Sequence, residues 1–412
     1  MIWLDTGRVF PSSVKLGYDR GSRSMGTRFL SPRFISFVWP RSPSHLISII
    51  RMRFLPGQCK CVLPWWTGFA LSLVLPLTTL GFLISGPHSI IESLLWSMPV
   101  WLLIIADHYG PAERRSVPVT APTWFFDGQL YLAAILQIIN VILIGVMVSQ
   151  LRWDSVAIIA PSFTDLLILR ILGGTNACCS VIAPAHELIH RRSRWQRNVG
   201  RLMLISVFYD HFFISHKLGH HARLGHAEDP STAYLHEDYD SYIKRSISRQ
   251  WRLAWRNRPR AVVEGLAVEV LLMLLYGLVF GPLALFVWMY LSWVAIRLLE
   301  AVNYFQHFGM TVQSGHSGYT AWRCDSAVSL FMFFSLTRHA DHHRRPAKPY
   351  QELESLPEEG PSLPYGYLGM ALWVKNASRS FRDWAGNEML SGRPVARPCA
   401  TGVQPAPSTR SG

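Results

Sequence analysis

Nine of the sixteen histidines in this chain have the spacing expected of metal ligands carried on helices. Residues three or four positions apart share one face of a helix, so each cluster can aim its imidazoles at a common point. Neutral imidazole binds iron, copper, zinc and nickel. Nine imidazoles are too many for one ion and suit two metals. The set comprises three clusters and one further histidine: His186 and His190; His216, His220 and His221; His339, His342 and His343; and His307.

A single cluster of this kind would be weak evidence, because histidine-rich loops are often only solvated polar surface. Three clusters and a ninth histidine on one predicted side of a membrane favour a metal centre instead. Zinc would suffice for hydrolysis. A pair of irons explains both the ligand count and the membrane setting, because apolar substrates concentrate there.

The elements that must position these histidines are apolar runs. The chain has 412 residues, is 50% hydrophobic and only 16% charged, and has a mean hydropathy of +0.18. A membrane-spanning helix needs about 20 predominantly apolar residues. The sequence therefore predicts an all-α integral membrane fold rather than a soluble protein with buried helices. Six runs are expected to span: 63–84, 90–106, 128–149, 155–183, 262–281 and 282–300.

The distribution of Lys and Arg predicts the orientation. The connections at 86–89 and 281–282 carry none, whereas the stretch from Arg191 to Arg260 and the chain after His307 are basic. By the positive-inside rule, both termini and the central loop are cytoplasmic, and a cytoplasmic helical cap holds the metal site. The net charge of +14 needs no nucleic acid. Anionic lipid headgroups or an acidic soluble partner explain it.

Five motifs carry a resemblance to a known family. They are HELIHRR, YDHFFISHKLGHH, EDPSTAY, NYFQHFG, and RHADHH followed by PYQELESLPEEGPSLPYGY. Over about residues 63–384 the chain resembles the membrane alkane 1-monooxygenases and the hydroxylase components of xylene monooxygenase. These belong to the fatty-acid-desaturase-like superfamily, and NYFQHFG separates their branch from ordinary desaturases.

The resemblance implies that all nine histidines bind two irons, with O2 as co-substrate. It implies hydroxylation of an unactivated C–H bond, in a terminal or benzylic methyl group of an alkane, fatty-acyl or alkylaromatic substrate. Electrons would come from a rubredoxin- or ferredoxin-type donor with its reductase, in the inner membrane of a bacterium. The six cysteines form no CxxC pair, so the donor is expected to be a separate protein.

Two departures from the family pattern concern the surroundings of the metals. Ser215 stands where alkane hydroxylases usually have Glu, and the segment Trp322-Arg323-Cys324-Asp325-Ser326 replaces one that is typically WNSNH. Hydrogen bonds to ligand imidazoles orient them and tune the metal. The departures therefore bear on the substrate more than on the chemistry.

Two carboxylates lie within the clusters. Glu187 is expected either to orient a ligand imidazole, to carry a proton, or to be a surface carboxylate. Asp341 is a candidate to accept an imidazole N–H. Inside the fourth run, Asp165 and Arg170 are expected to form a structural pair, because ionisable groups in spans usually face the bundle interior.

Histidines near the clusters but off their spacing are expected to be polar loop residues. These are His211, His226, His236 and His316.

The chain is expected to form one membrane oxygenase domain over residues 52–390. Residues 1–51 are expected to be a disordered basic extension, or to precede a true start at Met52. Residues 391–412 read as a disordered tail.

Other activities are compatible with the same clusters. A fatty-acyl desaturase or a di-iron fatty-acid decarboxylase would share the ligands and differ in product. A metal transporter would need polar ligands within the spans, and the six runs contain no histidine.

Leu75 is predicted to border the substrate channel. The segment Ala-Leu-Ser-Leu-Val-Leu-Pro at 70–76 resembles the first-span stretch that lines this channel in alkane hydroxylases, and some relatives carry a bulky aromatic there. Leu75→Trp should shift preference toward shorter chains, by about fourfold for each methylene excluded. Product yields across a panel of n-alkanes measure this. An unchanged chain-length profile would place Leu75 outside the channel.

Overall fold

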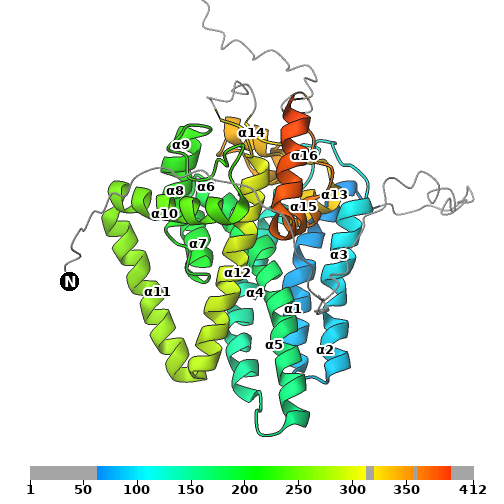
Figure 1. The fold of residues 1–412 in the computed structure, drawn as a ribbon, viewed down its shortest axis with the longest axis vertical. Helices are drawn as coiled ribbons and strands as arrows, with labels where there is room; N and C mark the ends of the chain where they lie inside the picture. The colour runs from blue at the N-terminus through cyan, green and yellow to red at the C-terminus, as the bar shows by residue number, and fades with distance from the viewer. Residues whose placement is uncertain (1–62, 312–319, 357, 359, 391–412) are drawn as a thin grey trace, which may run out of the picture. The chain divides into compact units, whose positions relative to one another are not determined.

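The computed structural model describes residues 63–390, except 312–319, 357 and 359. The described residues form helices joined by loops, and two isolated β-bridges are the only extended pairing among them. The all-α prediction is therefore confirmed (Figure 1). The extension predicted at 1–51 and the tail predicted at 391–412 lie outside the described residues.

Six helical stretches are long and apolar enough to cross a membrane, and all six predicted spans are confirmed. Together they make the chain a multi-pass membrane protein. The stretches are Trp65–Ser85 (η1, Trp65–Leu73, with α1, Val74–Ser85), Ile90–Tyr109 (α2, Ile90–Trp96, with α3, Met98–Tyr109), α4 (Thr123–Gln150), Val156–His190, α11 (Pro259–Phe280) and α12 (Pro282–Gln306).

The fourth stretch runs further than the sequence indicated. It joins α5 (Val156–Ala177), the π-helical turn η2 (Cys178–Ile182) and α6 (Ala183–His190) without a break. His186 and His190 therefore lie in its last turns, and His108 lies at the end of α3. The six apolar runs contain no histidine, but these two helical stretches continue past their runs and carry histidines at their ends.

The remaining helices gather at the end of the bundle where α6 ends (Figure 1). They are α7 (Arg194–Ile205), α8 (Phe212–Ser215), η3 (His216–His220), α9 (His221–Arg223), α10 (Tyr239–Asn257), α13 (Ala327–Met332), α14 (His339–Arg344), η5 (Tyr350–Glu352), α15 (Tyr367–Asn376) and α16 (Ser378–Leu390).

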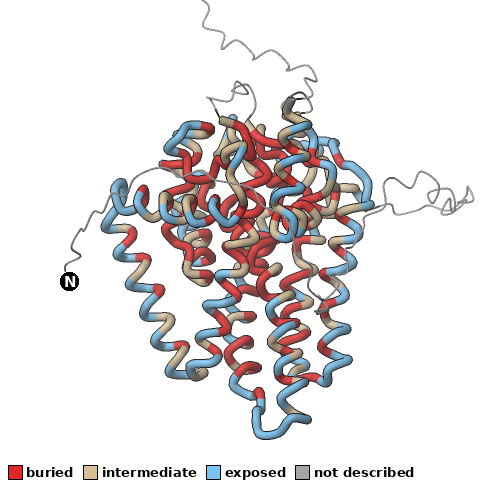
Figure 2. Tube along the Cα trace, in the orientation of Figure 1, coloured by how far each residue is buried: buried red, intermediate tan, exposed pale blue. Residues whose placement is uncertain are grey.

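Burial divides the described part of the molecule into two zones. Figure 2 shows buried residues concentrated where the helix ends meet the cap, whereas the outward faces of the spans are exposed. These exposed faces are apolar, as on α11, where Leu271, Leu274 and Leu278 are all exposed. Apolar side chains on that surface suit lipid contact. At the turn between α11 and α12, Gly281 has a φ of 87°, a conformation that glycine adopts without steric cost.

Asp165 is paired inside the bundle, but not with Arg170. Its carboxylate lies 3.0 Å from His88 Nδ1 and accepts hydrogen bonds from the backbone N–H of His88 and the hydroxyl of Ser93. Arg170 is exposed and donates to the Tyr290 hydroxyl at 2.9 Å. The predicted pair is wrong because residues five apart do not share a helix face, and Asp165 instead ties α5 to the α1–α2 connection.

A second buried carboxylate joins the cap to the bundle. Asp107 accepts hydrogen bonds from the hydroxyls of Ser326 and Ser329, each at 2.6 Å, and from the backbone N–H of Leu368 at 2.9 Å. It therefore holds α13 and the start of α15 against the end of α3. The chain that leads into α14 is fixed in this way.

The Asp165 contacts predict a specific stability difference. Asp165→Ala leaves the His88 ring and the His88 N–H without their acceptor, and the Ser93 hydroxyl keeps only the Ser89 carbonyl, which should cost about 3 kcal/mol or more. Thermal unfolding in detergent should show a clear drop in Tm. Arg170→Ala loses one exposed hydrogen bond and should shift Tm little. Equal losses in the two variants would restore the pairing expected from the sequence.

Candidate metal centre

All nine predicted ligand histidines lie at one end of the helical bundle. The fourth span supplies His186 and His190 from α6, and His307 directly follows α12. The short elements η3, α9 and α14 supply the other six. Membrane-length helices thus deliver three ligands, and short cap helices close over them.

The nine imidazoles form two groups that could each hold a metal ion. In each group, one nitrogen of every member lies within 4.8 Å of those of the others. The first group is His186, His190, His216, His221 and His342, and the second is His220, His307, His339 and His343.

Histidines from the same sequence cluster can belong to different groups. His216 meets His221, with 2.9 Å between their Nε2 atoms, whereas His220 belongs to the other group. The reason is the π-helical turn η3, in which the N–H of His221 bonds to the carbonyl of His216. An i→i+5 turn brings residues five apart together. The expectation that His216 and His220 share a target is therefore wrong.

α14 also serves both groups. His342 joins the first group, with its Nε2 atom 3.2 Å from that of His221. His339 and His343, four residues apart, join the second. The expectation that all three histidines of this cluster aim at one point is therefore wrong, and α14 spans the two groups.

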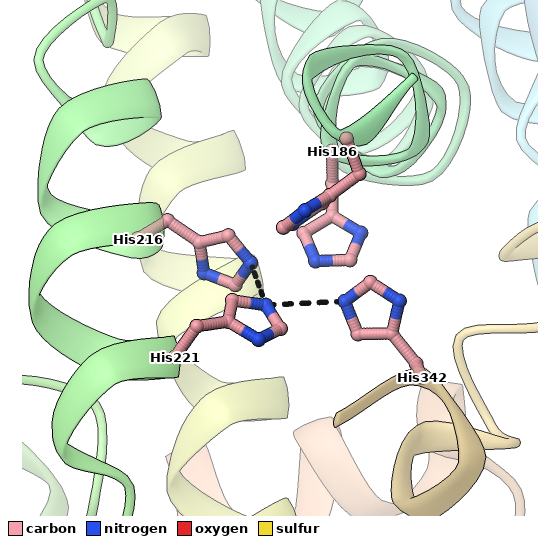
Figure 3. Close-up of side chains that lie close together, drawn as sticks. His186, His216, His221 and His342 are labelled. Atoms are coloured by element: carbon pink, nitrogen blue, oxygen red, sulfur yellow. Dashed lines mark hydrogen bonds between the residues drawn. The ribbon is translucent and has the colours of Figure 1, made fainter. Parts of the chain in front are cut away.

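The first group surrounds a small volume. Figure 3 shows His186, His216, His221 and His342 pointing toward one another from three segments of the chain. The Nε2 atoms of His186 and His190 are buried and have no hydrogen-bond partner among the described residues. A buried imidazole nitrogen without a partner costs free energy, and a metal ion at this point would use both lone pairs.

In the second group, hydrogen bonds from residues outside the group fix the orientation of two rings. His220 Nδ1 lies 3.0 Å from an Asp229 oxygen, and His307 Nδ1 donates to the carbonyl of Thr320 at 2.9 Å. With the proton on Nδ1, the Nε2 atom of a neutral imidazole carries a lone pair.

These lone pairs converge. His307 Nε2 is 3.0 Å from His339 Nε2, and His220 Nε2 is 3.1 Å from His343 Nε2. The Nε2 lone pairs of His220 and His307 are each satisfied either by a proton on the facing imidazole or by a cation between the two nitrogens. The residues present therefore fit a bound metal.

Burial also sets the protonation state that metal binding requires. Loss of hydration lowers the pKa of His307 to about 3, and it lowers those of His339, His342 and His343 well below the usual value. These imidazoles are therefore neutral near pH 7. Only neutral imidazole binds a metal ion.

Neither carboxylate within the clusters bonds a ligand imidazole among the described residues. Glu187 is buried and pairs with Arg191 at 2.7 Å, while it accepts the backbone N–H of Tyr350. Glu187 is therefore no surface carboxylate. HELIH also has the spacing of the zinc-protease HExxH helix, but this ion pair occupies the glutamate that would act as the base.

Asp341 is also held by cations. Arg345 and Lys348 donate to its carboxylate at 2.6 Å and 3.1 Å, and the backbone N–H of Glu354 donates at 2.9 Å. Asp341 therefore anchors α14 and the chain after it.

The carboxylate that does orient a ligand is Asp229. Besides His220, it accepts hydrogen bonds from the backbone N–H of Ser231 and the hydroxyl of Thr232. Asp229 lies in the EDPSTAY motif, whose Asp followed by Ser and Thr is a signal for such a turn. Sequence reasoning named the motif for its resemblance and did not assign the residue a role.

Trp322 positions His307 from both sides. Its backbone N–H donates to the carbonyl of Gln306 at 2.8 Å, and its indole N–H donates to that of Phe308 at 2.9 Å. The segment that departs from the family pattern thus holds the loop that carries one ligand. Ser215, the other departure, is buried and donates to the carbonyl of Phe212.

The histidines that do not follow the cluster spacing differ in their exposure. His226 and His236 are exposed, as expected, and His316 lies outside the described residues. His211 is buried, and its ring stacks on Trp251 with 3.8 Å between centroids. It lies in the loop between α7 and α8 and outside both histidine groups, as expected, but it is buried rather than solvated. Leu75 is buried in the hydrophobic core.

Comparison with known proteins places the site in context. A family model described as fatty acid desaturase matches residues 164–372, half of the chain, and this segment includes all nine histidines.

Three curated relatives match between 51% and 69% of the chain. Alkane 1-monooxygenase 1 of Pseudomonas aeruginosa is 29% identical over 255 residues, which are 56% of this chain and 66% of the relative. Alkane 1-monooxygenase 2 of the same organism is 26% identical over 311 residues, or 69% and 79%. Alkane 1-monooxygenase of Acinetobacter baylyi is 27% identical over 234 residues, or 51% and 56%. In the first and third cases the match covers less than two thirds of the relative's length.

Asp229 gives a direct test of ligand orientation. Asp229→Asn keeps the side-chain shape but removes the negative charge beside His220, so metal affinity should fall by about 10- to 100-fold. Titration of the metal-free protein, followed by measurement of bound metal, gives the affinity. Glu228→Gln, on the exposed neighbour, is the matched control and should leave the affinity unchanged. An unaltered affinity in Asp229→Asn would mean that His220 needs no such partner.

Proposed function

Because the chain belongs to the fatty acid desaturase family, we propose that it is a membrane monooxygenase that hydroxylates an unactivated C–H bond of an apolar substrate. The observation that carries the proposal is the convergence of nine buried or half-buried imidazoles in two groups. The relatives are named alkane 1-monooxygenases, which supports an alkane as the substrate. The overall reaction combines R–H, O2, two electrons and two protons to give R–OH and water.

The proposed ligands are the nine histidines, and the proposed metal is a pair of iron ions. Such a pair supplies the redox chemistry that activates O2. The chain holds the imidazoles neutral by burial, and Asp229, Thr320 and Trp322 fix two of the rings in place. The apolar bundle binds the substrate at about 0.8 kcal/mol per methylene and keeps water away.

We propose that a rubredoxin- or ferredoxin-type protein with its reductase supplies the electrons. Three cysteines lie among the described residues, and all three are buried and free, which gives no surface redox pair in that part of the chain. The basic cap suits an acidic donor. The positive-inside rule supports a cytoplasmic metal centre, and the bacterial origin of the relatives supports a bacterial inner membrane as the location. One membrane oxygenase domain over residues 52–390 stays our proposal for the organisation.

Desaturation is the second candidate, and the description of the matching family favours it. Both reactions begin with removal of hydrogen from carbon. Hydroxylation then delivers oxygen to that carbon, whereas desaturation removes a second hydrogen from its neighbour. The names of the relatives favour hydroxylation.

Isotope labelling separates the two reactions. Under 18O2, with reduced rubredoxin and a medium-chain alkane, we expect a terminal alcohol that carries the label. His342→Ala should abolish turnover, whereas His236→Ala, an exposed residue outside both groups, should retain it. Mass spectrometry of the products gives the answer. An unlabelled alkene as the main product would assign the chain to the desaturases, and an active His342→Ala would remove the basis of the proposed ligand set.

A further inference from the structure

A small polar chamber lies inside the membrane-spanning bundle, away from the histidines. Thr79 on α1, Asn140 on α4 and Asn176 on α5 line it. The Thr79 hydroxyl and the side-chain oxygens of both asparagines are buried and have no hydrogen-bond partner among the described residues. All three side chains are at most 2% exposed.

Three unpaired polar atoms in this position are costly. Each unsatisfied buried group costs about 1–3 kcal/mol, and the bilayer core offers no water to compensate. The chamber has a volume of about 20 Å3, enough for one water-sized group. A single small polar group is therefore the natural occupant.

A much larger apolar cavity adjoins the chamber. It has a volume of about 390 Å3 and lies among α4, α7, α11 and α12. Gln137, Val141 and Trp288 line both spaces. Ile138 and Ile142 on α4 and Leu275 and Val279 on α11 line its outer part and are exposed on the lipid-facing surface. An apolar cavity of about 150 Å3 already accepts benzene, so this one has room for an aliphatic chain.

The chemistry of the two spaces limits the ligand. Among the described residues that line them there is no Asp, Glu, Lys, Arg or His, so a charged headgroup finds no partner. The two unpaired asparagine oxygens require a donor, which an alkane, an aldehyde or an ester lacks. A hydroxyl group donates to one of them and accepts from Thr79.

We propose that these adjoining spaces form a binding site for a long-chain primary alcohol, with the hydroxyl in the chamber and the chain in the apolar cavity. The choice of a primary alcohol among neutral hydroxyl compounds rests on the proposed function, since this is the class of product that hydroxylation of an alkane yields. The site is separate from the nine histidines. It would take up product from, or release it to, the surrounding lipid.

Photolabelling without turnover tests the site. The full chain, loaded with iron and placed in lipid nanodiscs, is irradiated with a 1-dodecanol analogue that carries a diazirine at mid-chain. A dodecane analogue with the same diazirine is the comparison probe. We expect the alcohol to label residues 134–142 and 272–280 about fivefold more than the alkane, the value of one net hydrogen bond. Mass spectrometry of the peptides maps the label.

Matched variants assign the effect to the chamber. Thr79→Val keeps the shape and breaks no existing hydrogen bond, so folding should be unaffected, and Asn176→Leu is the second variant. Both should reduce alcohol labelling to the alkane level. Thr175→Val, beside Asn176, loses a hydroxyl that bonds only its own helix at the Ile171 carbonyl, and it should change nothing.

Equal labelling by the two probes, or alcohol labelling that survives both chamber variants, would overturn the inference and leave the chamber to a water molecule. A chain that hydroxylates alkanes but fails this test would overturn the inference alone. Specific labelling in a chain without hydroxylase activity would instead count against the proposed function.

Discussion

The lone pairs of nine imidazoles point into two small volumes at one end of a membrane bundle, and this convergence constrains the elements around it. Burial removes the protons that would otherwise keep such rings apart, because it lowers the pKa of histidines such as His307 and His342. Neutral rings in this arrangement bring their Nε2 atoms within 3.2 Å of one another. The fold must therefore hold them in place from behind, and a cation is what makes the arrangement favourable.

The hydrogen bonds that orient the ligand histidines come from chain segments that are fixed by further hydrogen bonds of their own. Asp229 orients His220 and is fixed by its own turn, while Trp322 grips the carbonyls on both sides of His307. Asp107 does not contact a ligand, but it stabilises the cap around them, because its hydrogen bonds hold α13 and α15 against the end of α3. Rigidity thus passes from the apolar bundle to the ligands through a few buried hydrogen bonds.

Residue type and spacing were enough to predict the spans and to select the nine histidines, because apolar runs and histidine clusters are local features. The pairing of ligands could not be predicted, because it depends on the π-helical turn at His216–His220, and an ordinary α-helix would have joined His216 to His220. Contacts between residues far apart in the sequence could not be predicted either. His88 is 77 positions from its partner Asp165, so proximity in sequence suggested Arg170 instead.

The same reasoning explains why the carboxylates within the clusters were misleading. Glu187 sits beside a ligand in sequence, but the next position along an α-helix points in another direction, and there it meets Arg191. Asp229 is nine residues from His220, yet the loop between them folds back so that the two meet.

The two zones of the molecule impose opposite demands on polar groups. Around the histidines, polar atoms are numerous, and unpaired ones such as the Nε2 atoms of His186 and His190 face a volume that a metal ion would fill. In the spans they are scarce, and the unpaired oxygens of Asn140 and Asn176 are therefore exceptions that need a reason. Hydroxylation converts a molecule without hydrogen-bonding capacity into one with a single donor. A protein that accepts the first and releases the second within a bilayer has use for a site that distinguishes them, and an unpaired acceptor beside an apolar cavity is the simplest device that does so.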